Sequence, residues 1–183
     1  MERHDFYLVL DLEATCSDDG SLPRREMEII EIGAVMVEGE TLESLSEFQT
    51  FVRPVRNPVL TDFCTSLTSI TQSQVNEAPG YREAAAALTE WASQYPGYHF
   101  CSWGNYDRHQ FEQDSEFHQV PYPLEPGHTN IKAEFAKKFH QRKQFGMVKA
   151  MKFLDIPLSG THHRGIDDAR NIVKLLRAMM RSY

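Results

Sequence analysis

The first predicted strand of this chain is Phe6-Tyr7-Leu8-Val9-Leu10, and Asp11-Leu12-Glu13 follows it directly. Five apolar, β-favouring residues in a row are typical of a buried central strand. Residues two apart on a strand point to the same face, with Cα atoms about 6–7 Å apart. Asp11 and Glu13 can therefore hold one cation together, which would offset the cost of burying two negative charges. The alternative is that Asp11 caps a turn and Glu13 is solvated, because a single Asp-x-Glu is a weak signal.

A second polar group lies near the other end of the chain, in His162-His163-Arg164-Gly165-Ile166-Asp167-Asp168. Residues 172–180 follow it with the apolar spacing of an amphipathic helix. Asp168 is predicted in the first turns of that helix, and His163 in the loop before it, within reach of the carboxylate. Histidine titrates near neutral pH, which suits His163 to accept a proton from water. Asp167 is expected to point elsewhere as a helix N-terminal acid, with His162 as a neighbour.

Asp107 is the candidate from the middle of the chain. It follows a predicted strand at residues 98–102 and a Trp103-Gly104-Asn105 turn, at the start of a predicted helix. By itself, an acid in that place is better explained as a cap or a dipole partner. A folded α/β domain could bring it together with the two terminal groups around divalent metal, a pattern that suggests phosphodiester chemistry.

Three motifs resemble those of the DEDD exonuclease superfamily, in its histidine-bearing DEDDh branch. They are Asp11-Leu12-Glu13-Ala14-Thr15, Ser102-Trp103-Gly104-Asn105-Tyr106-Asp107 and His163-Arg164-Gly165-Ile166-Asp167-Asp168-Ala169. Within that branch, residues 30–34, 63–72 and 130–132 are similar to the histone-mRNA and RNA-interference-enhancing 3′-exonucleases. The likeness runs from about residue 6 to residue 180 and departs from the family at none of the five catalytic positions.

This resemblance implies a ribonuclease-H-like mixed β-sheet flanked by α-helices, in a single domain over residues 1–183. It also implies a 3′-5′ exonuclease that shortens single-stranded nucleic acid, RNA in preference to DNA, and releases nucleoside 5′-monophosphates. Two Mg²⁺ or Mn²⁺ ions would be its cofactors, because hard oxygen ligands favour these ions over zinc. By resemblance, Asp11 would bridge both ions, Glu13 and Asp168 would complete the shell of one, and Asp107 would serve the other. His163 would take the proton of the attacking water.

The resemblance also indicates which residues contact the substrate. Ala14 and Thr15 are expected near the terminal sugar, through backbone or hydroxyl, and Leu67 against its base. Trp103 and Tyr106 could stack on bases, a contact worth about 1–3 kcal/mol in single-strand binders. The alternative for these two large aromatic side chains is an ordinary place in the core.

Other functions fit parts of the pattern. A haloacid-dehalogenase-type phosphatase would need Asp where Glu13 stands and would leave the His163 to Asp168 cluster without a role. A module that only binds RNA 3′ ends would be expected to lack one of the five catalytic residues. A ribonuclease-H or integrase-like endonuclease shares fold and metals, but His163, five positions before Asp168, favours the exonuclease branch. A DNA substrate stays open, because the distinction rests on contacts to the 2′-hydroxyl.

The remaining elements follow an α/β order. Strands are predicted at residues 6–12, 28–37, 45–52 and 98–102, and helices near residues 81–94 and 106–117. A short helical region after Pro58, a turn of helix started by Thr71, and three helices after the proline-rich loop at 121–126 complete the prediction. The chain contains no internal repeat or low-complexity linker, which favours one domain.

Charge is distributed unevenly, although the net charge of −7 argues at first against nucleic acid. Residues 1–126 hold 7 Lys and Arg against 22 Asp and Glu, whereas residues 127–183 hold 12 against 4. This basic third could follow a phosphate backbone, or it could be an ordinary solvated helix face. Its candidates are Lys132, Lys137, Lys138, Arg142, Lys143, Lys149 and Lys152.

The three cysteines, Cys16, Cys64 and Cys101, have no Cys-x-x-Cys spacing, so we expect reduced thiols and neither a disulfide framework nor a zinc knuckle. The sequence has no apolar run of about 18 residues and no signal-peptide pattern, which predicts a cytoplasmic protein without a membrane partner. Nothing in the sequence indicates a protein partner.

Overall fold

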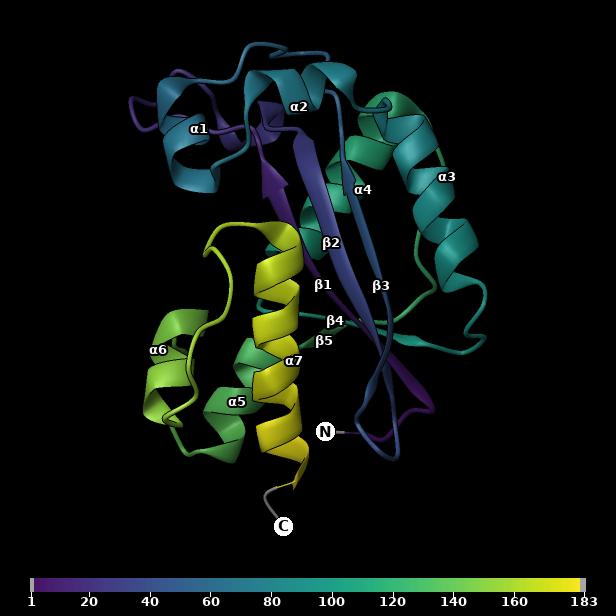
Figure 1. Ribbon diagram of the computed structural model, residues 1–183, viewed down its shortest axis with the longest axis vertical. Helices are drawn as coiled ribbons and strands as arrows, with labels where there is room; N and C mark the ends of the chain where they lie inside the picture. Colours follow the sequence, from purple (N-terminus) through teal and green to yellow (C-terminus); the bar gives the residue numbers. More distant parts are fainter. Residues whose placement is uncertain (1, 182–183) are drawn as a thin grey trace.

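The computed structural model describes residues 2–181, and its centre is one mixed sheet of five strands in the order β3-β2-β1-β4-β5 (Figure 1). The strands β1, β2 and β3 form an antiparallel meander, and β4 and β5 are added parallel to β1. Their bounds are β1 Phe6–Ala14, β2 Ile29–Glu38, β3 Ser44–Phe51, β4 His99–Ser102 and β5 Thr129–Asn130.

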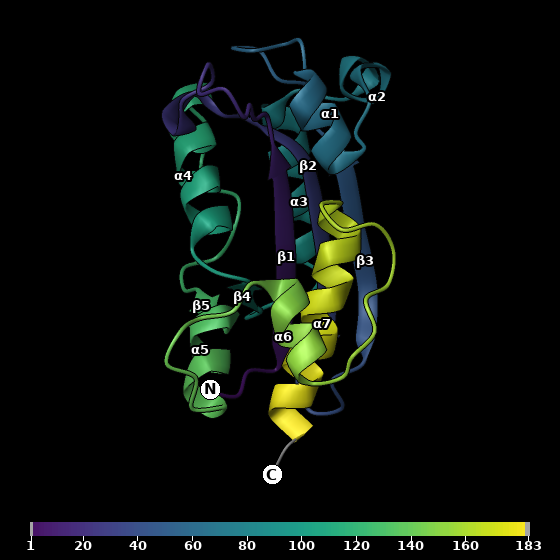
Figure 2. The same cartoon turned by 90° about the vertical axis from the view of Figure 1, so that its left-hand side faces the viewer.

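Helices cover both faces of this sheet. α3 and α4 lie on one face, and α5, α6 and α7 lie on the other, while α1 and α2 stand at the end of the sheet toward which β1 runs (Figures 1 and 2). A 3₁₀ turn at Arg24–Glu26 lies between β1 and β2. The helix bounds are α1 Asp62–Thr68, α2 Gln72–Glu77, α3 Tyr81–Ala92, α4 Tyr106–His118, α5 Ile131–Lys138, α6 Met147–Phe153 and α7 Gly165–Arg181.

Strand β1 divides its side chains between two cores. Tyr7 and Val9 pack with the apolar face of α7, and Leu8 and Leu10 pack with α3 and α4. Because alternate residues of a strand point to opposite faces, Asp11 and Glu13 lie on the α7 side. The alternation that builds the two cores therefore also aims both acids at the helix that carries Asp168.

The first turn of α7 lies directly on β2. Gly33 pairs with Asp11 across β1 and β2, and a Cβ atom there would collide with the backbone of Gly165 and Ile166. A Cβ atom at Gly165, the first residue of α7, would lie 3.0 Å from the Asp11 carbonyl oxygen, which is a tight contact. Helix α7 continues from there with buried residues on one side, among them Ile172, Leu176 and Met179. Its amphipathic pattern thus holds the helix on the sheet, and two glycines set how close its N-terminal end comes.

The predicted architecture is confirmed, and so is the order of its elements. The Thr71-started helix is α2, in which Thr71 and Gln74 form a capping box. Two details differ from the prediction. β1 runs on to Ala14, so Glu13 lies within the strand rather than just after its predicted end at residue 12, and β5, only two residues long, was not predicted. Within residues 2–181, no helix has the length and apolar character that a membrane crossing requires.

Candidate active site

The five predicted catalytic residues meet in one pocket of about 390 Å³. Figure 2 looks onto this side of the molecule, where β1 runs between α4 and α7. In this view α1 lies near the upper end of β1, and α6 lies near its lower end. β1 contributes Asp11 and Glu13, the start of α4 contributes Asp107, and the start of α7 and the loop before it contribute Asp168 and His163. Segments more than 150 residues apart in sequence thus supply one site.

Asp107 is tied to β1 by a hydrogen bond. Its Oδ1 accepts from the Leu12 backbone N–H at 3.1 Å. The pairing of β4 with β1 ends at Val9 and Cys101, so beyond that point the edge of β1 is open to the side chain. The acid at the start of α4 therefore serves as more than a helix cap, because it completes the hydrogen bonding of the strand that carries the other acids.

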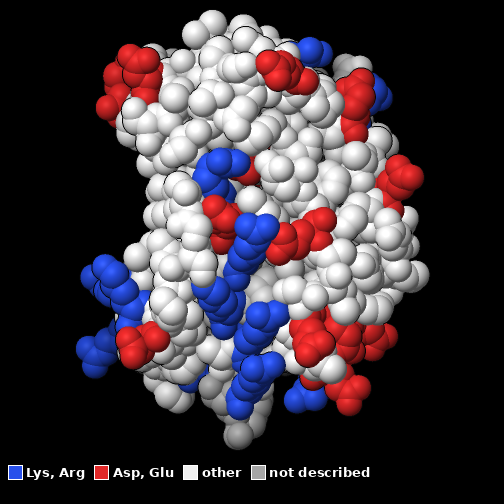
Figure 3. Space-filling model, viewed as in Figure 1, with Lys and Arg blue, Asp and Glu red and all other residues white. Residues whose placement is uncertain are grey.

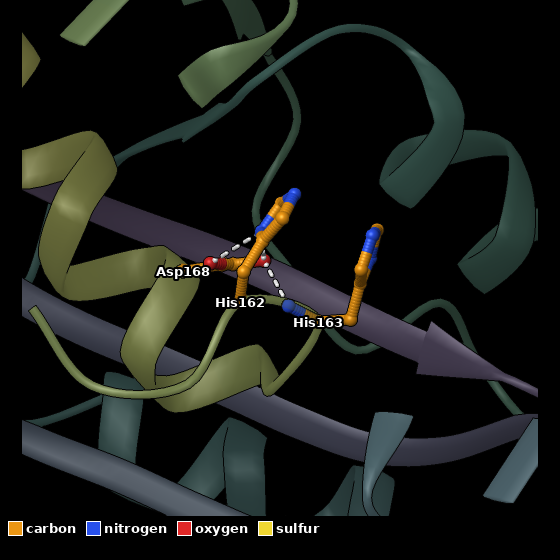
Figure 4. A group of neighbouring side chains, drawn as sticks. All are labelled: His162, His163 and Asp168. Atoms are coloured by element: carbon orange, nitrogen blue, oxygen red, sulfur yellow. Dashed lines mark hydrogen bonds and ion pairs between the residues drawn. The ribbon is translucent and has the colours of Figure 1, made fainter. Parts of the chain in front are cut away.

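Asp168 is held by the two residues that end the preceding loop (Figure 4). His162 Nδ1 lies 3.1 Å and 2.9 Å from the two carboxylate oxygens, and the backbone N–H of His163 donates to Oδ2 at 2.9 Å. The two imidazole rings stack with centroids 3.9 Å apart. The prediction of His162 as a mere neighbour is therefore too weak, since its ring contacts Asp168 directly while the His163 ring lies free of that carboxylate.

His163 lines the pocket from a left-handed backbone position. Its φ of 65° puts it in the left-handed region, which lets its backbone bind Asp168 while its side chain lines the pocket. Burial and the neighbouring His162 lower its pKa. A lowered pKa favours the neutral imidazole, which is the form that a general base requires.

Burial disfavours charge on all four acids, and repulsion by the neighbouring carboxylates adds to it for Asp11 and Glu13. Burial, then the carboxylates of Asp107, Glu13 and Asp168, raise the pKa of Asp11 well above its ordinary value. Burial and the nearby Asp168 raise the pKa of Glu13 to about 9, and burial raises that of Asp107 to about 6. Clustered carboxylates of this kind are stable in ionised form only beside positive charge.

The same residues fit a hard divalent cation. One carboxylate oxygen each from Asp11, Glu13 and Asp168 can be chosen so that all three lie within 4.8 Å of one another. Asp107 lines the same pocket outside this group of three. An all-oxygen set of ligands favours ions such as Mg²⁺ or Mn²⁺.

Four of the five predicted substrate-binding residues line the pocket, namely Ala14, Leu67, Trp103 and Tyr106. Thr15 does not line the pocket, because it is buried and its hydroxyl accepts from the Glu28 N–H at 2.9 Å. A sugar contact through the Thr15 hydroxyl is therefore not supported, and a contact through its backbone stays a prediction. Trp103 packs its ring on Phe135 in the core and also lines the pocket, so its stacking on a base stays a prediction. Tyr106 is 39% exposed.

A buried ion pair supports the loop that carries the histidines. The Arg164 guanidinium donates to the Glu31 carboxylate at 3.0 Å and 3.3 Å, and the Gly165 N–H donates to the same carboxylate at 3.0 Å. Sequence reasoning missed these positioning residues. The available signal was Glu31 itself, a charged residue between Ile30 and Ile32 in a strand that is otherwise apolar and therefore needs a partner.

Further pocket residues had no signal in the sequence. Cys16, Gly146 and Met147 line the pocket and come from the segment after β1 and from the start of α6. Cys16 reaches the site through the end of β1, whereas Gly146 and Met147 reach it because α6 packs on the same core as α7. No spacing rule connects such residues to the catalytic motifs.

A second hollow, lined by Lys149 and Lys152, adjoins the acidic pocket and shares Gly146, Met147 and His162 with it. Figure 3 shows basic side chains in a column over α7 and in a group over α5 and α6. Several on α7 already bind neighbours, as Arg170 binds Glu47 and Arg177 binds the Leu42 carbonyl. Among the predicted basic residues, Lys149 and Lys152 are thus the two that border the site.

Comparison with known proteins gives a consistent result. Residues 8–176 match the exonuclease (RNase T) family. The chain is 30% identical to human 3′-5′ exoribonuclease 1, over 97% of this chain and 53% of that protein, and 31% identical to the probable 3′-5′ exonuclease KapD of Bacillus subtilis, over 93% and 82%. The nuclease domain of 3′hExo, a DEDDh family member solved bound to rAMP, superposes with a TM-score of 0.90 at 29% identity, over 97% of this chain and 92% of that one. The chain spans about half or less of the length of the human relatives that it matches.

Proposed function

Since this chain belongs to the exonuclease family that residues 8–176 match, we propose that it is a metal-dependent 3′-5′ exonuclease acting on single-stranded RNA. The observation that carries the proposal is the convergence of Asp11, Glu13, Asp107 and Asp168 with a neutral His163 in one pocket. The ribonuclease-H-like fold and the exoribonuclease names of the relatives agree with it.

Metal ions would bind to the acidic residues. Asp11, Glu13 and Asp168 form the set whose oxygens lie near one another, and Asp107 would hold a second ion together with Asp11. We propose Mg²⁺ or Mn²⁺, two per site. Ions bound there would polarise the scissile phosphate, lower the pKa of a bound water molecule and stabilise charge on the departing oxygen.

The side chains of this protein would then have separate roles in the hydrolysis of the phosphodiester bond. His163 accepts the proton of the attacking water, and its backbone hydrogen bond to Asp168 keeps the imidazole beside the acids. The water oxygen attacks the phosphorus and the bond to the 3′ oxygen of the preceding nucleotide breaks. The product is a nucleoside 5′-monophosphate and a strand that is one nucleotide shorter.

The pocket would accommodate the 3′-terminal nucleotide, since its volume lies within the range of ligand pockets. Leu67 and Trp103 offer apolar surface to a base, and Ala14 permits close approach of a sugar. The preceding phosphates would then pass over the adjoining hollow, toward Lys149 and Lys152. Basic side chains that neutralise phosphates supply affinity without selecting sequence.

The experiment uses matched 5′-labelled RNA and DNA strands with the purified protein and Mn²⁺ or Mg²⁺. We expect a ladder of single-nucleotide steps on RNA, nucleoside 5′-monophosphates as products, and no reaction with EDTA or with Asp168→Asn. A 3′-phosphate on the strand should slow the reaction strongly. Cleavage of a circular RNA would instead indicate an endonuclease, and faster loss of the DNA strand would contradict the proposed preference for RNA.

A further inference from the structure

Two of the three cysteines lie side by side at the edge of the catalytic pocket. Cys16, half-buried, follows β1 and lines the pocket, and Cys64, fully buried, lies in the first turn of α1. The Thr61 hydroxyl connects their backbones, because it donates to the Cys16 carbonyl at 2.6 Å and accepts from the Cys64 N–H at 3.0 Å. Cys16 also packs on the small apolar cluster that contains Cys64 and Ile30.

The two sulfur atoms interact with each other. The side chains of Cys16 and Cys64 are hydrogen-bonded, and Cys64 Sγ lies 3.7 Å from the Ala14 carbonyl oxygen. The hydrogen bond from the Cys16 thiol lowers the pKa of Cys64 to about 7. Cys101 lies apart from this pair, since it is buried in β4 within the core beneath α7, where burial raises its pKa.

We propose that Cys16 and Cys64 form a redox modification site, in which a peroxide or a small disulfide closes the pair into a disulfide and thereby slows turnover in the adjacent pocket. The existence of this site follows from the position of the two thiols alone. Its effect on turnover rests on the proposed exonuclease function.

The chemistry balances with hydrogen peroxide as the oxidant. The hydrogen bond from the Cys16 thiol favours the thiolate on Cys64. This thiolate attacks the peroxide and releases hydroxide, which leaves a sulfenic acid on Cys64. Cys16, the sulfur that faces the pocket, then gives up its proton and attacks the Cys64 sulfur, and a second hydroxide leaves. Two thiols have lost two protons and two electrons, and the peroxide has become two water molecules.

Closing this bond would alter the pocket. A disulfide brings its sulfur atoms to about 2.05 Å, well inside the separation of hydrogen-bonded thiols. The pairing of β1 with β2 holds the strand as far as Ala14, so the approach must move the segment at Cys16 or the helix α1. Leu67 lines the pocket from that same helix, one turn after Cys64, so the apolar wall for the terminal base would shift with it.

The test treats the full chain with hydrogen peroxide, blocks remaining thiols with N-ethylmaleimide, and measures intact mass, peptide linkage and turnover on RNA. We expect a loss of two hydrogen masses, one cross-linked peptide joining Cys16 to Cys64, and a turnover at least about tenfold lower that dithiothreitol restores. The control Cys101→Ala should behave like the original chain. Cys64→Ala should form no internal cross-link and should lose less activity, with Cys64→Ser as a second variant if thermal unfolding shows that the first is unstable.

The outcomes separate the two parts of the proposal. If peroxide gives only irreversible oxidation or a cross-link that includes Cys101, the pairing of Cys16 with Cys64 is wrong. If the expected cross-link forms and turnover is unchanged, the modification does not regulate the site. A chain without exonuclease activity in its reduced form would contradict the proposed function, whereas the mass measurement would still decide whether the two thiols pair.

Discussion

Gly33 and Ile166 bring the central sheet and the last helix into direct backbone contact. A Cβ atom at Gly33 would lie 2.1 Å from the Ile166 nitrogen, a distance that two atoms without a bond cannot share. Gly33 pairs with Asp11, and Asp168 lies two residues after Ile166. The approach of two backbones at this point therefore sets the separation of the two acids.

Gly33→Ala should consequently destabilise the protein and reduce its activity together. Backbone on both sides cannot yield as a flexible side chain would, so we expect a loss of at least about 1–3 kcal/mol in the free energy of unfolding. Urea denaturation measures it. Gly146→Ala is the matched control, because a Cβ atom there meets open space, and its stability should change little. Equal effects of the two changes would contradict the role of the close approach.

Two Arg–Glu pairs at the start of α7 offer a direct comparison of buried and exposed charge. Glu31 in the buried pair is fully inaccessible, whereas Arg170 and Glu47 are 45% and 40% exposed. Arg164→Met should lower the free energy of unfolding by about 2–4 kcal/mol, because the buried Glu31 carboxylate then keeps its hydrogen bonds but loses its positive partner. Arg170→Met should lower it by less than about 1 kcal/mol.

Thermal unfolding of both variants measures this difference in stability. Turnover is expected to fall in the same order. The Arg164 variant is expected to lose activity as well as stability, since the Gly165 backbone and the loop before it rely on the same Glu31 carboxylate. An Arg164→Met protein as stable and active as the Arg170→Met control would show that the loop is held by other contacts.

The acidic cluster predicts how stability depends on pH and on metal. Glu13 ordinarily titrates near 4.5, and in the fold its pKa is raised to about 9. The folded protein without metal thus binds more protons than the unfolded chain between these values, so its stability should fall as pH rises through that window. Mg²⁺ or Mn²⁺ should raise the melting temperature, and more at pH 8 than at pH 5.5.

Asp11→Asn provides the matched variant for this prediction. It removes one of four repelling carboxylates, so it should be more stable than the original chain at pH 8 without metal, and it should lose the stabilisation by Mn²⁺. Differential scanning calorimetry with and without EDTA measures both effects. Metal-free stability that is constant from pH 5 to pH 9 would contradict the clustering of ionisable acids.

The two adjacent histidines should differ in their effect on catalysis. His163→Asn keeps a residue type that tolerates the left-handed backbone at φ 65° but removes the imidazole. Its turnover should fall by about 10²–10⁴-fold with metal still bound. His162→Asn should lose less than about tenfold, because that ring is held in a hydrogen bond to the Asp168 carboxylate. Turnover and Mn²⁺ affinity measured on both variants decide this, and a reversed order would assign the proton transfer to His162.

The sequence was sufficient for the parts of the fold that have strong local patterns. The apolar run of β1, the alanine-rich α3 and the amphipathic α7 each carry their own period, and all three were predicted. β5 could not be, because Thr129 and Asn130 join the sheet only through backbone pairing with the end of β4. The extension of β1 through Glu13 was missed for a similar reason. Backbone pairing with β2 continues through Glu13, although the polar side chains there suggest that the strand has ended.

The site was predictable where a motif named its residues, and not where packing alone supplies them. Asp11, Glu13, Asp107, His163 and Asp168 came from motifs, and all five line one pocket. The Thr15 side chain lies outside the pocket because the register shift between Glu13 and Ala14 interrupts the strand alternation, and its hydroxyl binds the Glu28 N–H. Partners such as Arg164 for Glu31 join positions 133 residues apart, which no local pattern can connect.

Lys149 and Lys152 should contribute charge to RNA binding without contributing to chemistry. The double variant Lys149→Ala/Lys152→Ala removes two cations from the hollow next to the catalytic pocket, while Arg53→Ala/Arg82→Ala removes two exposed cations far from it. In a His163→Asn background, which retains the acids, the slope of log affinity against log salt concentration for a single strand should fall by about 1.4 for the lysine pair. The arginine pair should leave the slope unchanged. Because each phosphate contact releases condensed counterions, the slope reports how many lysines meet the backbone, and an equal slope in both double variants would mean that the strand leaves the pocket by another path.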